Sequence, residues 1–521
     1  MKLWPLRRIV KYGIASSAVV GTGFSLAAND YNLNSIGIVR LTRAAITVFD
    51  IAHTYKTKLY YKEWDKASPE YLQKKSEVHY IAAARLLELC RTNKGVYIKI
   101  GQHVGALEYL LPMEYVKTMK VLHSNAPENT VEDLYKVIRQ DLRVDPEELF
   151  TSFSEKPLGT ASLAQVHRAT LKDGREVAVK VQHPYVRGNS IVDIKTMECL
   201  VKIMEWVFPD FKMQWLVDES KKNLPMELDF VHEGRNAEKC AKMFHEYDWL
   251  VVPKIFWEYS TSRVLVMEYV EGGQVNDLDY IQRNNINVME VTEKLGKLYS
   301  QMIFIDGYVH SDPHPGNILL RKNEKTGKTD VLLLDHGLYA NLTNKFRYEY
   351  SKLWLSILSV DRQGMRYHAN NLGVEGNLYG LFACMLTGRP WESVMKGVGN
   401  VEQTDDEKEL LQNNTSAVIN YIAEILQNMD RQLLLVMKTN DLIRSIETNL
   451  KTHNRMTAFW VMSKCCIKSI FNEDYRQATT RWERFTIRLK ETWTLLKLNV
   501  FYFYMGLRRM DLKRSLKALT L

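Results

Sequence analysis

The chain has 521 residues, 46% of them hydrophobic and 25% charged, so it is a globular protein too long for one ordinary hydrophobic core. Its net charge of +9 is concentrated at the ends: residues 1–29 carry +4 and residues 481–521 carry +7, which leaves −2 between them. This distribution argues against nucleic acid as a partner. It indicates that the basic ends act in targeting or contact an anionic membrane surface. The six scattered cysteines form no C-x-x-C pair, so neither a zinc site nor a disulfide framework is indicated.

Residues 1–32 begin with a basic stretch that contains no acid, followed by an apolar run over residues 12–28. Arginines without acids, among many Ser, Ala and Gly residues, are typical of a mitochondrial targeting segment. We therefore expect a mitochondrial location, associated with the inner membrane. A secretory signal is disfavoured because no clear A-x-A cleavage site is present. The run is at the short limit for a membrane span, so a cleaved segment and an anchor both stay open.

Residues 33–150 are expected to form a helical extension. Apolar residues are dense at 81–89, and Val131, Leu134 and Ile138 recur at helical spacing. Prolines punctuate this region and mark breaks between its helices.

Residues 151–270 are expected to form a small lobe rich in strands. Residues 164–171 alternate apolar and polar side chains, and an Asp-Gly turn leads to a returning strand at 176–181. Residues 188–245 then return to a helical pattern.

A short apolar strand at 264–270 ends this lobe, and Glu268 and Val270 are its candidate nucleotide-binding residues. Residues 271–455 are expected to form a larger helical lobe, interrupted by two motif loops. This order predicts an α+β protein with a bilobal protein-kinase-like fold, which has a small β-rich N-lobe and a larger helical C-lobe.

Residues 456–521 are expected to form a basic C-terminal helical region. Residues 493–507 are apolar and aromatic, and basic residues follow them. Such a helix can lie on anionic lipid, or it can pack on the body of the protein with a solvated basic end. Both interpretations stay open on the sequence alone.

Two late motifs carry candidate catalytic chemistry. An H-x-D-x-x-x-x-N string contains Asp312 and Asn317, and an expected strand at 318–320 follows it. An apolar strand at 331–334 then delivers Asp335, which a His-Gly pair follows. Phosphoryl transfer needs a carboxylate at the acceptor oxygen, and an amide oxygen and a carboxylate on Mg²⁺. Asp312 is therefore the candidate catalytic carboxylate, which positions or deprotonates the acceptor, and Asn317 and Asp335 are the candidate metal ligands.

Upstream, a V-A-V-K string places Lys180 on an otherwise apolar strand. Taken singly, each motif is compatible with a capped turn, a strand-end Asp or an edge lysine. Their order, with 132 residues from Lys180 to Asp312 and 23 more to Asp335, predicts the three positions of a kinase site. A helix carboxylate should hold the lysine: ordinary spacing favours Glu198, and Glu227 is the alternative.

The segment expected to contact the nucleotide phosphates has alanines where a kinase loop has glycines. Glycines let backbone N–H groups approach phosphate, so this loop should be stiffer and tighter on the nucleotide. The candidate nucleotide-binding residues of the loop are Leu158, Gly159, Thr160, Ala161, Ser162, Leu163, Ala164, Gln165 and Val166.

Two more features depart from a conventional protein kinase. Ser311 stands where an arginine would grip an activation-loop phosphate, and no A-P-E string follows Asp335. The usual docking platform for a peptide substrate is therefore not visible in the sequence.

These departures coincide with a family pattern. The alanine-rich loop ending A-Q-V-H, a K-x-G-Q string at Lys99, Gly101 and Gln102, and an E-x-D string at Glu227 and Asp229 resemble the aarF/UbiB family of atypical kinases. The resemblance spans residues 75–345.

The resemblance selects Glu227 over Glu198 as the partner of Lys180. It also implies that the K-x-G-Q helices fold over the active site and hinder protein substrates. His336 departs from the family pattern, in which phenylalanine packs the regulatory core, so switching between active and inactive states is in doubt.

The resemblance implies an ATPase-like or small-molecule reaction linked to coenzyme Q and membrane lipids. The expected cofactors are ATP or ADP with Mg²⁺, and the expected partners are a lipid-like or small acceptor and a mitochondrial membrane surface. A nucleotide-gated scaffold that acts largely without catalysis is the alternative, and a conventional Ser/Thr protein kinase is disfavoured.

Overall fold

The computed structural model describes residues 36–519, apart from residues 62, 66–67, 106–110, 124–127, 210, 212, 398–424, 426–428 and 453–454. The targeting segment predicted at residues 1–32 therefore lies outside the described residues. The chain forms two compact units. The first comprises Met1–Arg235 and Lys254–Val270, and the second comprises Asn236–Pro253 and Glu271–Leu521.

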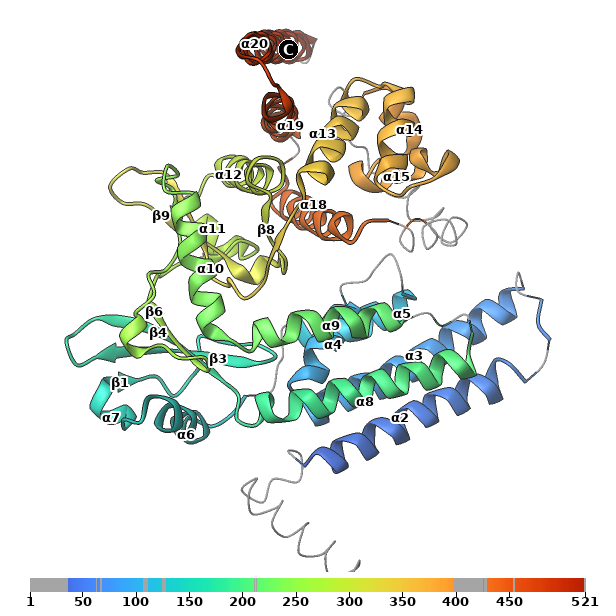
Figure 1. Cartoon of the computed structure of the whole chain (residues 1–521), viewed down its shortest axis with the longest axis vertical. Coiled ribbons are helices and arrows are strands. Elements are labelled where there is room, and N and C mark those ends of the chain that lie inside the picture. Colours follow the sequence, from blue (N-terminus) through green and yellow to red (C-terminus); the bar gives the residue numbers. More distant parts are fainter. Residues whose placement is uncertain are drawn as a thin grey trace, which may run out of the picture. The chain divides into compact units, whose positions relative to one another are not determined.

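The first unit contains a helical layer in which α2, α3 and α8 run side by side (Figure 1). Its helices are α2 (Gly37–Lys58), α3 (Pro69–Asn93), α4 (Val96–Gly105), α5 (Met113–Met119), α8 (Val186–Val207) and α9 (Gln214–Glu227). Buried apolar side chains from α2, α3 and α4 form their common core. A buried ion pair between Arg40 of α2 and Asp193 of α8 adds a directional contact, with Nη2 and Oδ2 2.6 Å apart. The helical character predicted for this part of 33–150 is confirmed.

The first unit also contains an antiparallel sheet in the order β1-β3-β4-β6, with β2 paired to β3. Its strands are β1 (Phe150–Phe153), β2 (Gly159–Thr160), β3 (Ala164–Leu171), β4 (Glu176–Gln182) and β6 (Val264–Glu268). The predicted strands and the hairpin between β3 and β4 are confirmed. Helix α6 (Val131–Leu142) covers one face, because Leu134, Val137 and Ile138 share the core with alternate residues of the strands. Helix α7 (Pro146–Leu149) leads from α6 into the sheet.

The second unit is mainly helical. Its strands are β5 (Leu250–Val251), β7 (Gly273–Gln274), β8 (Tyr308–His310), β9 (Ile318–Lys322), β10 (Thr329–Leu333) and β11 (Tyr339–Asn341). They form a sheet in the order β5-β10-β9-β7 and a separate pair, β11-β8. The described helices of eight residues or more are α12 (Val288–Ser300), α13 (Asn344–Leu358), α14 (Arg362–Asn371), α15 (Tyr379–Thr387), α18 (Arg431–Asn449), α19 (Arg455–Gln477) and α20 (Arg481–Leu519).

Helix α10 (Phe230–Met243) contributes residues to both units. Within the part of the chain that the structure describes, no helix combines the length and the apolar content needed to cross a membrane. All six cysteines are described and are free thiols; Cys199 is exposed, Cys384 is half-buried and the other four are buried.

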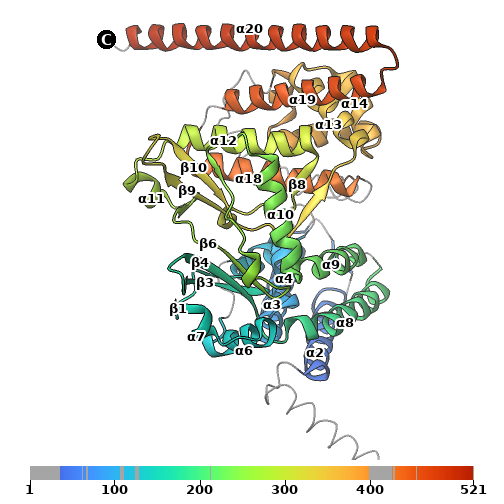
Figure 2. The same ribbon diagram turned by 60° about the vertical axis from the view of Figure 1, so that its left-hand side comes forward.

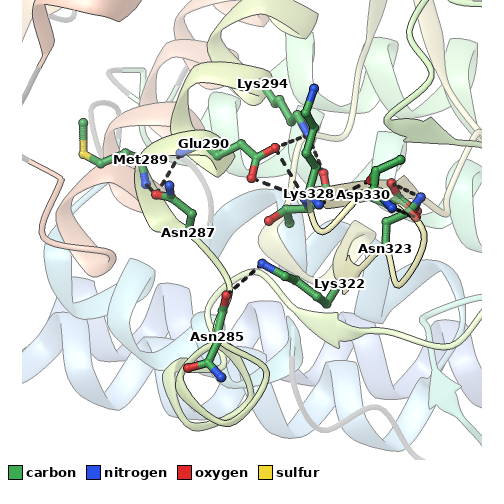
Figure 3. Close-up of polar contacts among 11 residues, drawn as sticks. Asn285, Asn287, Met289, Glu290, Lys294, Lys322, Asn323, Lys328 and Asp330 are labelled. Atoms are coloured by element: carbon green, nitrogen blue, oxygen red, sulfur yellow. Dashed lines mark hydrogen bonds and ion pairs between the residues drawn. The ribbon is translucent and has the colours of Figure 1, made fainter.

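The β9–β10 hairpin, whose two strands carry the predicted metal ligands at their ends, is fixed to α12 by a polar cluster (Figure 3). The Lys294 ammonium lies 2.6 Å from Glu290 Oε1 and donates to the carbonyl oxygen of Thr329 at 2.6 Å. Asp330 accepts hydrogen bonds from Asn323 at 3.2 and 3.1 Å across the turn of the hairpin. Because Lys294 is buried, its charge depends on these oxygen partners.

We expect Lys294→Ala to lower the free energy of unfolding by about 2–3 kcal/mol, because it removes two hydrogen bonds of a buried cation and leaves Glu290 without that partner. Lys328→Ala is the matched control, because it removes an exposed lysine from the same hairpin and should change stability by less than about 0.5 kcal/mol. Chemical denaturation measures both values, and equal losses would show that this cluster does not anchor the hairpin.

Candidate functional site

The predicted site residues fall into two groups, one in each unit, and each group is described by itself. The first unit holds Lys99, Lys180 and the alanine-rich loop. The second unit holds Asp312, Asn317 and Asp335.

Lys180 lies on β4, the third strand in the sheet order, and its ammonium is held by a buried carboxylate. Its Nζ atom is 2.6 Å from Oε1 of Glu233, and only 12% and 4% of the two side chains are exposed. The aromatic ring of Phe230 lies 5.3 Å from the same nitrogen. Glu233 lies in the first turn of α10, where a carboxylate is also favoured by the helix dipole.

The prediction that Glu227 fixes Lys180 is therefore wrong, and so is the spacing argument for Glu198. Helix α9 ends at Glu227, whose Oε2 lies 2.9 Å from Nζ of Lys99. Glu198 forms ion pairs with Lys202 and Lys221 on the protein surface, at 3.0 and 2.9 Å. Two carboxylates six residues apart thus hold two different lysines, because the chain turns between α9 and α10.

The K-x-G-Q residues lie on α4, against α9 (Figure 1). Lys99 and Glu227 line a cavity of about 20 Å³ between these helices, which has room for one water molecule. Gly101 is required by close packing, because a Cβ atom there would collide with the side chain of Leu122. Gln102 donates from Nε2 to the carbonyl oxygen of the same Leu122 at 3.0 Å.

The E-x-D aspartate has a local role in the structure. Asp229 lies between α9 and α10, and its Oδ1 accepts the backbone N–H of Val231 at 3.1 Å. This contact satisfies one of the free N–H groups at the start of α10, which is the helix that carries Glu233.

The alanine-rich loop is a tight connection between β2 and β3. Leu158 donates its backbone N–H to Val166 at 2.7 Å, and Ala161 donates to Ala164 at 2.8 Å. Ser162, Leu163 and Ala164 are buried. These contacts hold the loop in a compact turn, and its stiffness stays a prediction from its composition.

Two residues outside the predicted set hold this loop. His183 donates its backbone N–H to Leu163 at 2.9 Å, and its Nε2 donates to the carbonyl oxygen of Ala161 at 3.0 Å. Asn129 donates from Nδ2 to Nδ1 of His183 at 2.9 Å, and its own backbone N–H donates to Oε1 of Gln165 at 2.6 Å. Sequence reasoning gave neither of these residues a role.

Burial lowers the pKa of His183 to about 4, from an ordinary value near 6.5. As the pH falls, this histidine is protonated near pH 6.5 in the unfolded chain but only near pH 4 in the folded protein. The folding stability therefore decreases as the pH drops from about 6.5 to about 4. Above that range the imidazole is neutral, with one nitrogen as donor and the other as acceptor, as the loop contacts require.

The end of β6 holds the other two predicted nucleotide-binding residues. Glu268 donates its backbone N–H to Lys254 at 2.8 Å, and its exposed carboxylate accepts the Lys254 N–H at 3.4 Å. Val270 is half-buried beyond the strand. The backbone amide of Glu268 is thus engaged within the first unit.

In the second unit, β9 and β10 place the acid and amide side chains. Asn317 immediately precedes β9, and its Nδ2 donates to the carbonyl oxygen of Asp312 at 3.2 Å. Asp335 follows β10, and its Oδ1 accepts the Gly337 N–H at 2.9 Å. Leu334 donates its N–H to the carbonyl oxygen of Asn317 at 3.0 Å, which joins the two loops directly.

His310 links the same two loops through its side chain. Its Nδ1 accepts the backbone N–H of Asp312 at 3.3 Å, and its Nε2 donates to the carbonyl oxygen of Asp335. This arrangement requires a neutral imidazole with the proton on Nε2. The motif contained His310, but sequence reasoning gave it no role.

The donor set of the second unit fits Mg²⁺. Asn317 and Asp335 offer oxygen ligands, and Mg²⁺ is commonly held by one or two protein oxygens completed by water and phosphate. No group of three or more His, Cys, Asp or Glu side chains suited to a metal occurs among the described residues. That result is compatible with a site that uses an amide oxygen and a bound nucleotide.

His336 is buried and makes polar contacts through both ring nitrogens. Its Nε2 donates to the carbonyl oxygen of Leu333 at 3.1 Å, and its Nδ1 accepts from the hydroxyl of Tyr339 at 2.9 Å. The rings of His336 and Tyr339 are stacked, 5.8 Å apart. Asn236 of α10 donates to the carbonyl oxygen of His336 at 3.0 Å. A polar network thus surrounds His336, where the resemblance led us to expect a packed phenylalanine.

Comparison with known proteins shows which family the chain is similar to. The model of the ABC1 atypical kinase-like domain matches residues 121–369. The chain is 62% identical to AarF domain-containing kinase 1 of Drosophila melanogaster, over 98% of this chain and 99% of that protein. It is 48% identical to AarF domain-containing protein kinase 1 of Mus musculus, over 97% and 96%. It is 35% identical to a putative ABC1 protein of Arabidopsis thaliana, over 90% of each.

The similarity covers both units and all the motifs from K-x-G-Q to Asp335. The kinase-like fold that the order of the motifs predicted is confirmed. The chain therefore belongs to the AarF/ABC1 family of atypical kinases.

Proposed function

We propose that the chain is an atypical kinase or ATPase that binds ATP, or ADP, with Mg²⁺. The observation that carries the proposal is the buried ion pair of Lys180 and Glu233, at 2.6 Å, on a sheet whose β2–β3 connection is the alanine-rich loop. A strand lysine held by a helix carboxylate is the arrangement by which kinases orient the α and β phosphates. In the second unit, the loop that precedes β9 holds Asp312 and Asn317, the carboxylate and the amide that the same chemistry requires.

In the proposed reaction, Lys180 orients the phosphates and Asp312 positions the acceptor hydroxyl. The bond from the γ-phosphorus to the bridging oxygen breaks as a new bond forms to the acceptor oxygen. The acceptor proton passes to Asp312, and ADP leaves. Asn317 and Asp335 would hold Mg²⁺, which neutralises charge on the phosphates when it is bound. Water as the acceptor gives an ATPase.

For the acceptor we propose a lipid-like or small molecule at a mitochondrial membrane, in membrane-lipid or coenzyme Q homeostasis. Family membership supports an atypical reaction, and the lack of an A-P-E string argues against ordinary peptide docking. The acid-free N-terminal segment supports a mitochondrial location at the inner membrane.

A scaffold gated by nucleotide is the second candidate. The contacts of His336 on both ring nitrogens favour it, because they fix the segment after Asp335 that switches in ordinary kinases. The stiff alanine-rich loop points the same way, because it favours nucleotide retention over turnover.

We expect Asp312→Asn to reduce Mg-ATP turnover at least about 100-fold, because the amide cannot accept the acceptor proton. Asp335→Asn should weaken Mg-nucleotide binding, because it removes an anionic metal ligand. Purified full-length protein assayed for phosphate release measures both effects. Glu324→Gln is the matched control, because it neutralises an exposed acid in the β9–β10 turn.

Equal turnover in the parent chain, Asp312→Asn and Asp335→Asn would refute catalysis at this site. Rescue of a null phenotype by the Asp312→Asn protein would favour the scaffold, and failure to rescue would favour catalysis.

The corrected lysine partner gives a second expectation. Glu233→Gln should weaken ATP binding about tenfold or more, because Lys180 loses its buried carboxylate. Glu227→Gln is matched in size and charge and leaves that pair intact, so it should have a smaller effect. Titration of each purified variant with ATP distinguishes them. The reverse order of effects would restore Glu227 as the functional partner.

The alanine-rich loop gives a third expectation. Ala161→Gly should loosen the loop and change the ratio of ATP to ADP affinity, because glycine gives the backbone beside the phosphates more conformational freedom than alanine. His183→Ala should act in the same direction, because it removes the side-chain contact to Ala161. Thr170→Gly, at the far end of β3, is the control. Unchanged affinities in both loop variants would contradict the link between stiffness and nucleotide preference.

A further inference from the structure

Helix α20 has two apolar faces, and only one of them is covered. Figure 2 shows α20 as one long helix that lies along α19. The covered face contains Ile487, Leu498 and Tyr502, and the Tyr502 ring stacks on Trp460 of α19 at 4.7 Å. The covered face accounts for how the helix is attached to its unit.

The second face is a continuous stripe of large apolar side chains that are 49–72% exposed. The residues of this exposed stripe are Trp482, Phe485, Leu489, Trp493, Leu496, Val500 and Phe503. At about 100° per residue they fall within an arc of about 80°, roughly opposite to the covered face. Exposed apolar surface of this length marks an interaction site rather than a solvated face.

Basic side chains flank the exposed stripe on both sides. Arg481 lies on one flank, and Lys490 and Lys497 lie on the other, at about 80–100° from the middle of the stripe. Arg488 is on the first flank too, but it pairs with Glu491 and its guanidinium lies over the ring of Tyr475 in α19. The ammonium of Lys497 lies 5.5 Å from the ring of Trp493, so the two groups share one surface.

The acidic side chains of the same segment are engaged elsewhere. Glu483 accepts the backbone N–H groups of Thr479 and Thr480 at 3.0 and 3.1 Å, which caps the start of α20. Glu491 is buried and pairs with Arg488. The surface that a partner would meet is therefore apolar in the middle and cationic at its edges, and residues 481–521 carry +7 in total.

We infer that the exposed stripe of α20 is a docking surface for a membrane that contains anionic phospholipids. Tryptophan and phenylalanine enter the boundary between headgroups and acyl chains, while flanking lysines and arginines reach the phosphates. A protein partner for such a stripe would need a long acidic groove, whereas an anionic bilayer supplies the apolar layer and the charge together. The inference deepens the proposed membrane location by naming the surface that makes contact.

The test uses the purified full-length chain and two kinds of vesicle, phosphatidylcholine alone and phosphatidylcholine with phosphatidylglycerol at 7:3. Co-sedimentation should show preferential binding to the anionic vesicles, weakened by salt. The double variant Trp493→Ser with Phe503→Ser should reduce that binding at least about tenfold. The matched control is Trp206→Ser with Phe49→Ser, which removes a Trp and a Phe that are at least as exposed from α8 and α2, and it should leave vesicle binding unchanged.

A charge variant keeps the test decisive if the apolar variant folds poorly. Lys490→Gln with Lys497→Gln should weaken binding to anionic vesicles by about fivefold for each lysine, and leave binding to neutral vesicles unchanged. Unaltered binding by both α20 variants would overturn the inference. An equal loss of vesicle binding in the control would also overturn it. A change from dimer to monomer in the apolar variant, with vesicle binding unchanged, would overturn it as well, because the stripe would then contact a second copy of the chain.

Vesicle binding is measured without nucleotide, and Mg-ATP turnover is measured separately on the same variants. Loss of lipid binding with normal turnover supports the docking surface whatever the fate of the catalytic proposal. Normal lipid binding in the α20 variants refutes the docking surface even if turnover is confirmed.

Discussion

In the first unit, the arrangement of the predicted site residues depends on one buried ion pair, between Lys180 and Glu233. A lysine in a β-sheet can keep its charge away from water only if a carboxylate lies within hydrogen-bonding distance, and Glu233 does so at 2.6 Å. The pair fixes the start of α10 against β4, and Asp229 caps the same helix start. The geometry of Lys180 is therefore set by the end of one helix and the beginning of the next.

Most of the fold could be predicted from the sequence, because its longer strands appear as alternating or continuous apolar runs and its motifs have kinase spacing. Strands β3, β4, β6, β9 and β10 were all located in this way. The two-residue strands β2, β5 and β7 were missed, because so few residues show no periodicity. Strands β5 and β7 form through pairing with longer strands that are distant in the sequence, whereas β2 pairs with β3, the next strand along the chain.

The candidate site was less predictable than the fold, because side-chain partners depend on where helices end. Glu198, Glu227 and Glu233 are all helical carboxylates downstream of Lys180, and no spacing rule separates them. Only the turn after α9 directs Glu227 to Lys99 and leaves Glu233 for Lys180. His183 escaped notice for a similar reason, since its contacts to the loop come from folding and not from a motif.

The close approach of Gly101 to Leu122 has a consequence for how genetic variation in this protein should be interpreted. Residue 101 touches no predicted ligand, yet the Cβ atom of even an alanine would collide with Cδ1 of the fully buried Leu122, so either that side chain or α4 must shift. Lys99 lies two positions earlier on that short helix and would be carried away from Glu227 by the same displacement. A Gly101→Ala variant can therefore disturb the contact between Lys99 and Glu227 although it removes no functional group.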